Sequence, residues 1–187
     1  MWNTGENKIE VELIFIRHGK TKGNLEGRYI GRLDESLCEE GIEAIKNKEY
    51  PDVDFAFVSP MKRCQETLNL IYPNVTRYVI DEFKEIYFGD YEGMNYAQLN
   101  GKEEYQRFID SGGRTSFPNA EKQEEFVERV MRGFEQAVEI IKKENLSKVA
   151  FVVHGGTIMA ILSNLLGGEY FDYQIKNGET YTCSITL

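Results

Sequence analysis

The chain contains only two histidines, and each lies between an apolar run and a glycine. His18 follows residues 11–16 and Arg17, and His154 follows residues 149–153. A short apolar run that ends in a polar, glycine-containing stretch is typical of a buried strand in a parallel sheet. Ligands bind beyond the carboxyl ends of such strands. We therefore expect the two imidazoles to share one crevice, although a single histidine is more often a buried structural residue.

The segment that contains His18 is locally basic in a chain whose net charge is −9. Within residues 17–32, five cations stand against Glu26 as the single acid, a local charge of +4: Arg17, Lys20, Lys22, Arg28 and Arg32. The acidic chain as a whole argues against a nucleic-acid partner. Positive charge concentrated at one place instead predicts a small anionic ligand.

Two histidines beside arginines suit phosphoryl transfer. A neutral imidazole, with an unperturbed pKa of about 6.5, can attack phosphorus and form a phosphohistidine. Arginine binds phosphoryl oxygens in pairs, and Arg63, in the first turn of a predicted helix, can reach the same crevice. The leaving alkoxide needs a proton from a carboxylic acid at the rim. The residue types leave five candidates for that acid: Asp81, Glu82, Glu85, Asp90 and Glu92.

Other chemistries fit the sequence less well. Zinc needs three or four ligands, commonly at short spacing, whereas His18 and His154 lie far apart and beside cations. The sequence has no G-x-S-x-G elbow of a serine hydrolase and no G-x-x-x-x-G-K-[ST] loop for ATP. We expect neither a metal ion nor a cofactor.

Apolar runs alternate with helical patterns along the chain. Strands are predicted at residues 11–16, 53–58, 77–80, 149–153 and 181–187. Helices are predicted at residues 36–48, from Met61 to just before Pro73, from 119 or 120 to 145, and at 158–166. This alternation predicts an α/β fold, a three-layer α/β/α sandwich with a mostly parallel central sheet.

The length suits a single domain, residues 1–187, with an aromatic-rich elaboration at about 83–117. The aromatic side chains of that stretch either pack together or form a wall for a substrate. The N-terminal residues lack the pattern of a signal peptide, and no apolar run approaches the length of a membrane span. Cys38, Cys64 and Cys183 form no C-x-x-C pair, which predicts reduced thiols and a cytoplasmic protein without a membrane partner.

Four ordered segments resemble the motifs of one family. RHGKTKGNLEGRYIGR is similar to the R-H-G-x-[ST]-x-x-N signature of the histidine phosphatase superfamily, the phosphoglycerate-mutase-like proteins. SPMKRCQET resembles its S-P-x-x-R-x-x-x-T segment, KEIYFGDYEG its E-x-x-x-G-x-x-E-G segment, and VVHGGTI its second-histidine block.

The resemblance assigns roles by position. It implies that His18 is the phosphorylated nucleophile, that Arg17, Arg63 and His154 clamp the phosphoryl oxygens, and that Glu85 is the general acid. The expected substrate-binding positions are Asn24, the Gly155 amide, Thr21, Arg28 and Gly31. Thr67 and Glu92 match motif positions and are expected to be structural.

The expected activity takes account of three departures from the family motifs and of the short, acidic chain. Lys20 replaces a common acidic residue, Ile30 replaces a small hydroxyl residue typical of mutases, and residues 118–122 replace P-x-G-E-S. We expect a phosphatase for a small phosphomonoester, nearest the α-ribazole phosphatase branch. The alternatives are a phosphoglycerate-type mutase and a non-catalytic protein that binds a phosphate ligand.

Overall fold

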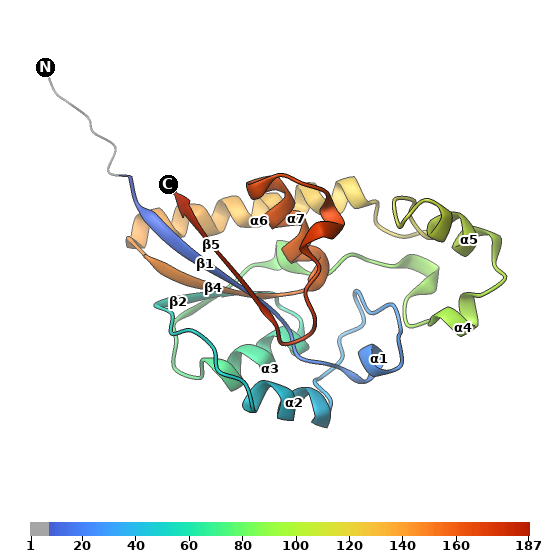
Figure 1. Ribbon diagram of the computed structural model, residues 1–187, viewed down its shortest axis with the longest axis horizontal. Coiled ribbons are helices and arrows are strands. Elements are labelled where there is room, and N and C mark those ends of the chain that lie inside the picture. The colour runs from blue at the N-terminus through green and yellow to red at the C-terminus, as the bar shows by residue number, and fades with distance from the viewer. Residues whose placement is uncertain (1–7) are drawn as a thin grey trace, which may run out of the picture.

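The computed structural model describes residues 8–187, which form a five-stranded sheet with helices on both faces (Figure 1). The strands are β1 (Glu10–Arg17), β2 (Phe55–Val58), β3 (Arg77–Val79), β4 (Lys148–Val153) and β5 (Thr180–Thr186). Their order is β3-β2-β4-β1-β5, and all neighbours pair in parallel except β5, which runs antiparallel to β1. The predicted α/β sandwich with a mostly parallel sheet is confirmed.

Seven α-helices and three short 3₁₀ helices complete the described part of the chain. The α-helices are α1 (Lys22–Leu25), α2 (Glu39–Lys46), α3 (Lys62–Ile71), α4 (Tyr96–Leu99), α5 (Glu103–Asp110), α6 (Gln123–Glu144) and α7 (Gly155–Leu166). The 3₁₀ helices are η1 (Asp81–Phe83), η2 (Gly89–Tyr91) and η3 (Tyr170–Tyr173). Helices α6 and α7 cover one face of the sheet, and α2 and α3 cover the other (Figure 1).

Helices cover both faces of the sheet, and side chains alternate between these faces along each strand. Leu13 and Phe15 pack on the side of α6 and α7, whereas Ile14 and Ile16 pack on the side of α3. This explains why the strand runs are continuously apolar in the sequence.

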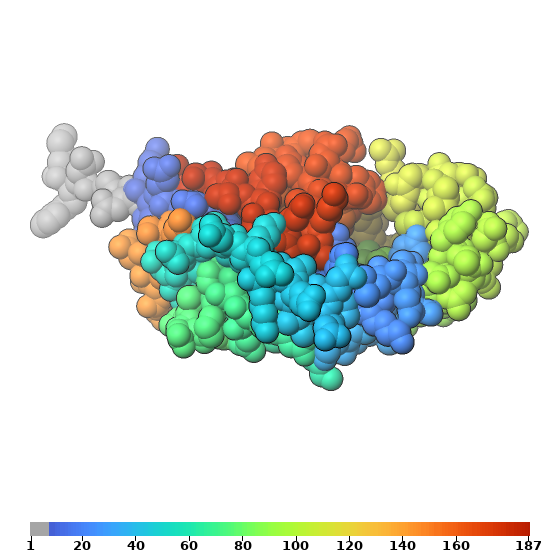
Figure 2. Space-filling model, turned by 60° about the horizontal axis from the view of Figure 1, so that its bottom comes forward, coloured from blue at the N-terminus to red at the C-terminus, as the bar shows by residue number. Residues whose placement is uncertain are grey.

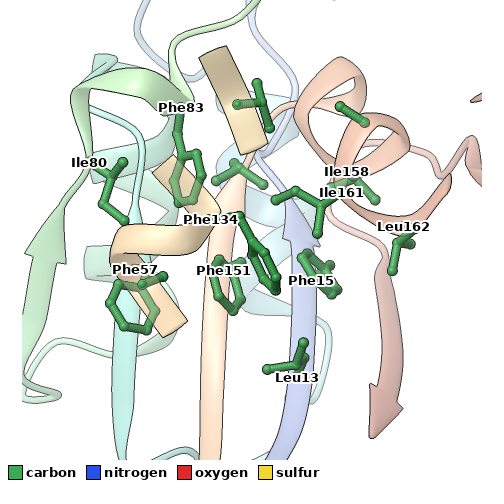
Figure 3. Packing of buried hydrophobic residues seen from close by; sticks show 14 of the residues in the cluster. Leu13, Phe15, Phe57, Ile80, Phe83, Phe134, Phe151, Ile158, Ile161 and Leu162 are labelled. Atoms are coloured by element: carbon green, nitrogen blue, oxygen red, sulfur yellow. The ribbon is translucent and has the colours of Figure 1, made fainter. Parts of the chain in front are cut away.

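The core on the α6 side is built around Phe151 of β4. Its ring stacks on Phe15 and Phe57 of the neighbouring strands, with centroids 5.0 and 5.1 Å apart, and also contacts Phe83 and Phe134 (Figure 3). All five rings are buried. The central strands are therefore fixed to one another and to the covering helices.

Three predicted helix starts differ from the structure by three residues or more, and one of them is α2, which begins at Glu39 rather than 36. The last long helix, α7, begins at Gly155, three residues before the predicted start, because His154 is its N-cap. Helix α6 begins at Gln123 rather than 119 or 120, since Asn119 has a left-handed backbone with φ 56°. The earlier start of α7 brings its first amides to the end of β4.

The predicted aromatic elaboration divides between two cores. Phe83 belongs to the main core, whereas Tyr91, Leu99, Tyr105 and Phe117 form a separate buried cluster. Helices α4 and α5 carry part of this cluster beyond the carboxyl ends of β1 and β4 (Figure 1). None of the helices in residues 8–187 combines the length and the apolar character needed to span a membrane.

Replacing the central ring should cost much of the stability. We expect Phe151→Ala to lower the free energy of unfolding by about 3–5 kcal/mol, because it removes a large buried side chain and leaves a cavity. Urea denaturation checks this value. Tyr96→Ala, at a side chain that is 62% exposed, is the control and should cost under about 1 kcal/mol. Equal losses in the two variants would contradict this description of the core.

Candidate active site

The register of the parallel strands brings the two histidines together. Arg17 of β1 lies opposite Val153 of β4, so that the next residue of each strand emerges at the same edge. The His18 amide donates to the Val153 carbonyl at 3.0 Å. The rings of His18 and His154 meet edge to face, with centroids 5.2 Å apart. The shared crevice expected from the sequence is present.

The hydrogen bonds of His18 select one tautomer. Its Nδ1 lies 2.7 Å from the Gly19 carbonyl oxygen, which can only accept, so Nδ1 carries the proton. Nε2 keeps a lone pair, and the Nε–H of Arg63 donates to it at 3.3 Å. Thr67 holds the loop in place, since its Oγ1 accepts from the Gly19 amide at 2.9 Å.

Arg63 is completely buried in the first turn of α3. Its two terminal nitrogens donate to the carbonyl oxygens of Leu33 and Gly31 at 2.9 and 2.8 Å. Neutral carbonyls orient the guanidinium without cancelling its charge. The cation therefore remains available to an anion beside His18.

Arg17 provides the second guanidinium of the site. One terminal nitrogen donates to the Ile175 carbonyl at 2.8 Å, whereas the buried Nε has no hydrogen-bond partner within residues 8–187. Its guanidinium lies against Gly155, where an added Cβ would be 3.3 Å from Cζ. A buried, unpaired donor of this kind is suited to an oxyanion.

His154 is held by two side chains of the neighbouring segment. Its Nε2 lies 2.8 Å from Ser59 Oγ, and Cys64 Sγ lies 3.5 Å from the same nitrogen. Burial lowers the pKa values of both His18 and His154 well below 6.5, and the charge of Arg63 adds to this effect. Both rings are therefore neutral near pH 7.

Glu85 lies where α7 begins. Its Oε1 accepts from the Ile86 amide at 2.9 Å, and its Oε2 accepts from the Gly156 amide at 3.2 Å. Burial raises the pKa of this carboxyl, although the two amides and the charges of Arg63 and Arg17 oppose the rise. A carboxyl with a raised pKa can hold and deliver a proton.

Asn24 and Gly155 are two of the predicted substrate-binding residues. Asn24 Oδ1 accepts from the Thr21 amide at 3.1 Å and from Asn177 Nδ2 at 3.4 Å, which assigns its Nδ2 as the end left to donate. Gly155 contributes the first residue of α7 beside Arg17.

Three other predicted substrate-binding residues make contacts within the protein. Thr21 caps α1, and its Oγ1 accepts from the Asn24 amide. Arg28 binds Glu26 and the Gly93 carbonyl. Gly31 lets two segments approach closely, because an added Cβ would lie 1.9 Å from the Ile86 carbonyl oxygen.

Most of the predicted basic loop is neutralised within the protein. Lys20 pairs with Glu40 at 2.5 Å, and Arg32 lies 3.6 Å from Glu121. Within residues 8–187, Arg17 and Arg32 are the two arginines of the loop that keep a buried Nε without a hydrogen-bond partner. Glu92 is structural as expected, since its Oε1 accepts from the amides of Gly31 and Leu33.

Sequence reasoning missed several residues that support the site. Asn177 Nδ2 donates to the His18 carbonyl at 3.0 Å, and Ser59 orients His154. Gly156 is required beside Glu85, because an added Cβ would lie 2.3 Å from Oε1. The S-P and H-G-G motifs contained two of these positions. Asn177 follows no motif, and only the fold brings it to His18.

A cavity of about 350 Å³ opens next to these groups, and Arg17, Glu85, Gly155 and Gly156 form part of its wall. Figure 2 shows the recess between the C-terminal segment, in red, and the yellow-green α4–α5 segment. Within residues 8–187, no three His, Cys, Asp or Glu side chains are grouped so that they could hold a metal ion.

The chain belongs to the histidine phosphatase superfamily, since the model of its branch 1 matches residues 13–187. A broad-specificity phosphatase of Saccharomyces cerevisiae is 30% identical over 97% of this chain and 80% of its own length. A phosphoglycerate mutase of Schizosaccharomyces pombe is 29% identical over 83% of this chain and 79% of its own length. The crystal structure of the α-ribazole phosphatase from Shigella flexneri has the same fold, with a TM-score of 0.80 and 24% identity. The match covers 92% of this chain and 89% of that one. The family resemblance of the motifs is confirmed.

The two histidines should remain neutral at unusually low pH. We expect both rings to stay uncharged down through pH 6.5, with Nδ1 of His18 protonated, because burial and Arg63 lower both pKa values. Nitrogen-15 NMR of the imidazoles against pH measures the charge and the tautomer. The urea-unfolded chain is the reference and should titrate near about 6.5. A folded-state midpoint at that same pH would contradict the electrostatics described above.

Proposed function

We propose that the protein is a phosphomonoester hydrolase that forms a phosphohistidine on His18. The state of the His18 ring supports this most strongly. Its Nδ1 is engaged by Gly19 and its pKa is lowered, so Nε2 keeps a nucleophilic lone pair at neutral pH.

In the first step, Nε2 of His18 attacks phosphorus, and the bond from phosphorus to the alcohol oxygen breaks. The guanidiniums of Arg17 and Arg63 bind the phosphoryl oxygens, and Arg63 Nε exchanges its bond to His18 for one of them. Glu85 gives a proton to the leaving oxygen, and burial, which raises the pKa of this carboxyl, favours the protonated form.

In the second step, the Glu85 carboxylate takes a proton from water, and the water oxygen attacks phosphorus. The bond from nitrogen to phosphorus breaks, inorganic phosphate leaves, and both His18 and Glu85 return to their starting states. Asn24 Nδ2, His154 and the Gly155 amide complete the pocket for the oxygens. We propose that no metal ion or cofactor takes part, because guanidiniums and amides supply the positive charge.

Hydrolysis is favoured over mutase chemistry by the charge of the cavity. A mutase must also hold a second phosphorylated acid, yet Arg17 is the only cation that lines the cavity within residues 8–187. The mutase remains the second candidate because a relative carries that name.

We propose a small phosphorylated metabolite as the substrate and α-ribazole 5′-phosphate as the first compound to test. A structure of the same fold carries the name α-ribazole phosphatase. Because the three cysteines are free thiols, we also propose that the enzyme acts in the cytoplasm.

The nucleophile can be tested directly. We expect the wild-type protein to hydrolyse p-nitrophenyl phosphate in excess EDTA, and His18→Ala to lose at least about 10³-fold in rate, since no other group can form the covalent intermediate. Acid-quenched protein should carry acid-labile phosphate only when His18 is present. Loss of wild-type activity in EDTA would exclude the metal-free mechanism. Turnover of 3-phosphoglycerate to 2-phosphoglycerate without release of phosphate would favour the mutase.

The role of Glu85 predicts a dependence on both pH and leaving group. For an alkyl phosphate, kcat/KM should fall as pH rises through the raised pKa of Glu85, because the acid is lost. Glu85→Gln should lower that rate about 10²–10⁴-fold. It should lower the p-nitrophenyl phosphate rate much less during phosphorylation, since this leaving group departs without a proton. Single-turnover kinetics on both substrates make the comparison. Equal losses on both would show that Glu85 is not the general acid.

A further inference from the structure

The cavity beside the phosphoryl site has an aromatic wall drawn from separate segments. Phe108 of α5 packs against Phe117 with ring centroids 4.4 Å apart, and Tyr29 meets Phe117 at 5.0 Å. All three rings line the cavity. Tyr170 and Phe171 of η3 line the same cavity.

Gly113 lies next to both Phe108 and Phe171. Gly113 has a left-handed backbone with φ 81°, and a Cβ placed there would lie 3.0 Å from Phe171 Cζ and 3.5 Å from Phe108 Cζ. The ends of the two rings therefore approach each other over this residue. A cavity lined by aromatic rings from separate segments suits an aromatic group better than a flexible polar chain.

Three charged side chains line the cavity in the described part of the chain, namely Arg17, Glu85 and Glu121. Arg17 is the single lining cation in the described part of the chain, and the phosphoryl group already requires it. Of the two lining carboxylates, Glu85 is the proposed acid. Glu121 is bound at both oxygens by Arg129 at 2.8 Å. A carboxylate or second phosphate on the alcohol would therefore find no further lining cation in the described part of the chain.

The size of the cavity is also informative. A dry cavity of about 150 Å³ binds benzene, so about 350 Å³ has room for roughly two such rings. Because Glu85 and Arg17 lie in the same wall, a ring system in the cavity would belong to the alcohol that Glu85 protonates.

We infer that this cavity binds the uncharged aromatic part of the alcohol, so that the substrate class is phosphate monoesters of alcohols that carry a one- or two-ring aromatic system. The inference rests on the proposed function but does not depend on the names of the relatives. Phe108 and Phe171 are then specificity-determining residues.

Three primary alkyl phosphates of similar leaving-group basicity test the inference: 2-(2-naphthyl)ethyl phosphate, propyl phosphate and 3-phosphooxypropanoate. We expect kcat/KM to be about 100-fold higher for the naphthyl ester than for propyl phosphate, since apolar contacts in a pocket give 10–200-fold discrimination. The acidic ester should be the poorest substrate. Phe171→Ala should reduce kcat/KM for the naphthyl ester about tenfold and leave propyl phosphate within twofold. Tyr96→Ala, an exposed aromatic outside the cavity, should change neither.

A binding experiment separates this inference from the proposed function. Calorimetry with 2-(2-naphthyl)ethylphosphonate, which cannot be hydrolysed at a P–O–C bond, should show binding that Phe171→Ala weakens about tenfold. If no ester is turned over but this binding is found, the hydrolase proposal fails and the aromatic site stands. If esters are hydrolysed without preference for the naphthyl group, or with preference for the acid, the aromatic site is wrong and the hydrolase stands.

Discussion

The site depends on one buried cation, the guanidinium of Arg63. Burying a charge is costly unless it is hydrogen-bonded, and here the carbonyls of Gly31 and Leu33 hold it without neutralising it. Its third donor points at Nε2 of His18. The same charge helps lower the pKa values of both histidines and opposes the rise at Glu85. Orientation of the loop at residues 31–33 and the electrostatics of the pocket are thus linked through one side chain.

The parallel sheet supplies the geometry that this cation needs. Strands β1 and β4 pair in register up to Arg17 and Val153, so the two histidines emerge together. The Phe151 ring packing fixes these strands beneath the site. At the edge of the sheet, α7 begins directly after His154, and its Gly156 amide binds Glu85. Glu85, His18 and the two arginines are therefore positioned by backbone elements rather than by side-chain contacts alone.

The segment between β3 and α6 has two physical roles. The segment has a small core of its own, formed by Tyr91, Leu99, Tyr105 and Phe117. Burial of these apolar side chains stabilises its folded state. Of these residues, Phe117 also lines the cavity, together with Phe108 of α5. Internal packing of the aromatic stretch is therefore confirmed, and a role as a wall for a substrate stays a prediction.

The sequence by itself determined the sheet, the pairing of the histidines and most of the groups around them. Continuous apolar runs that end in Arg17-His18 and His154-Gly155 allow little else in a parallel sheet. Only the tertiary structure decided which tautomer His18 adopts, because that depends on the Gly19 carbonyl and on Arg63. It also gave Thr21, Arg28 and Gly31 supporting contacts and brought Asn177 to His18. Those outcomes depend on contacts between segments far apart in the chain, which residue types and local spacing do not specify.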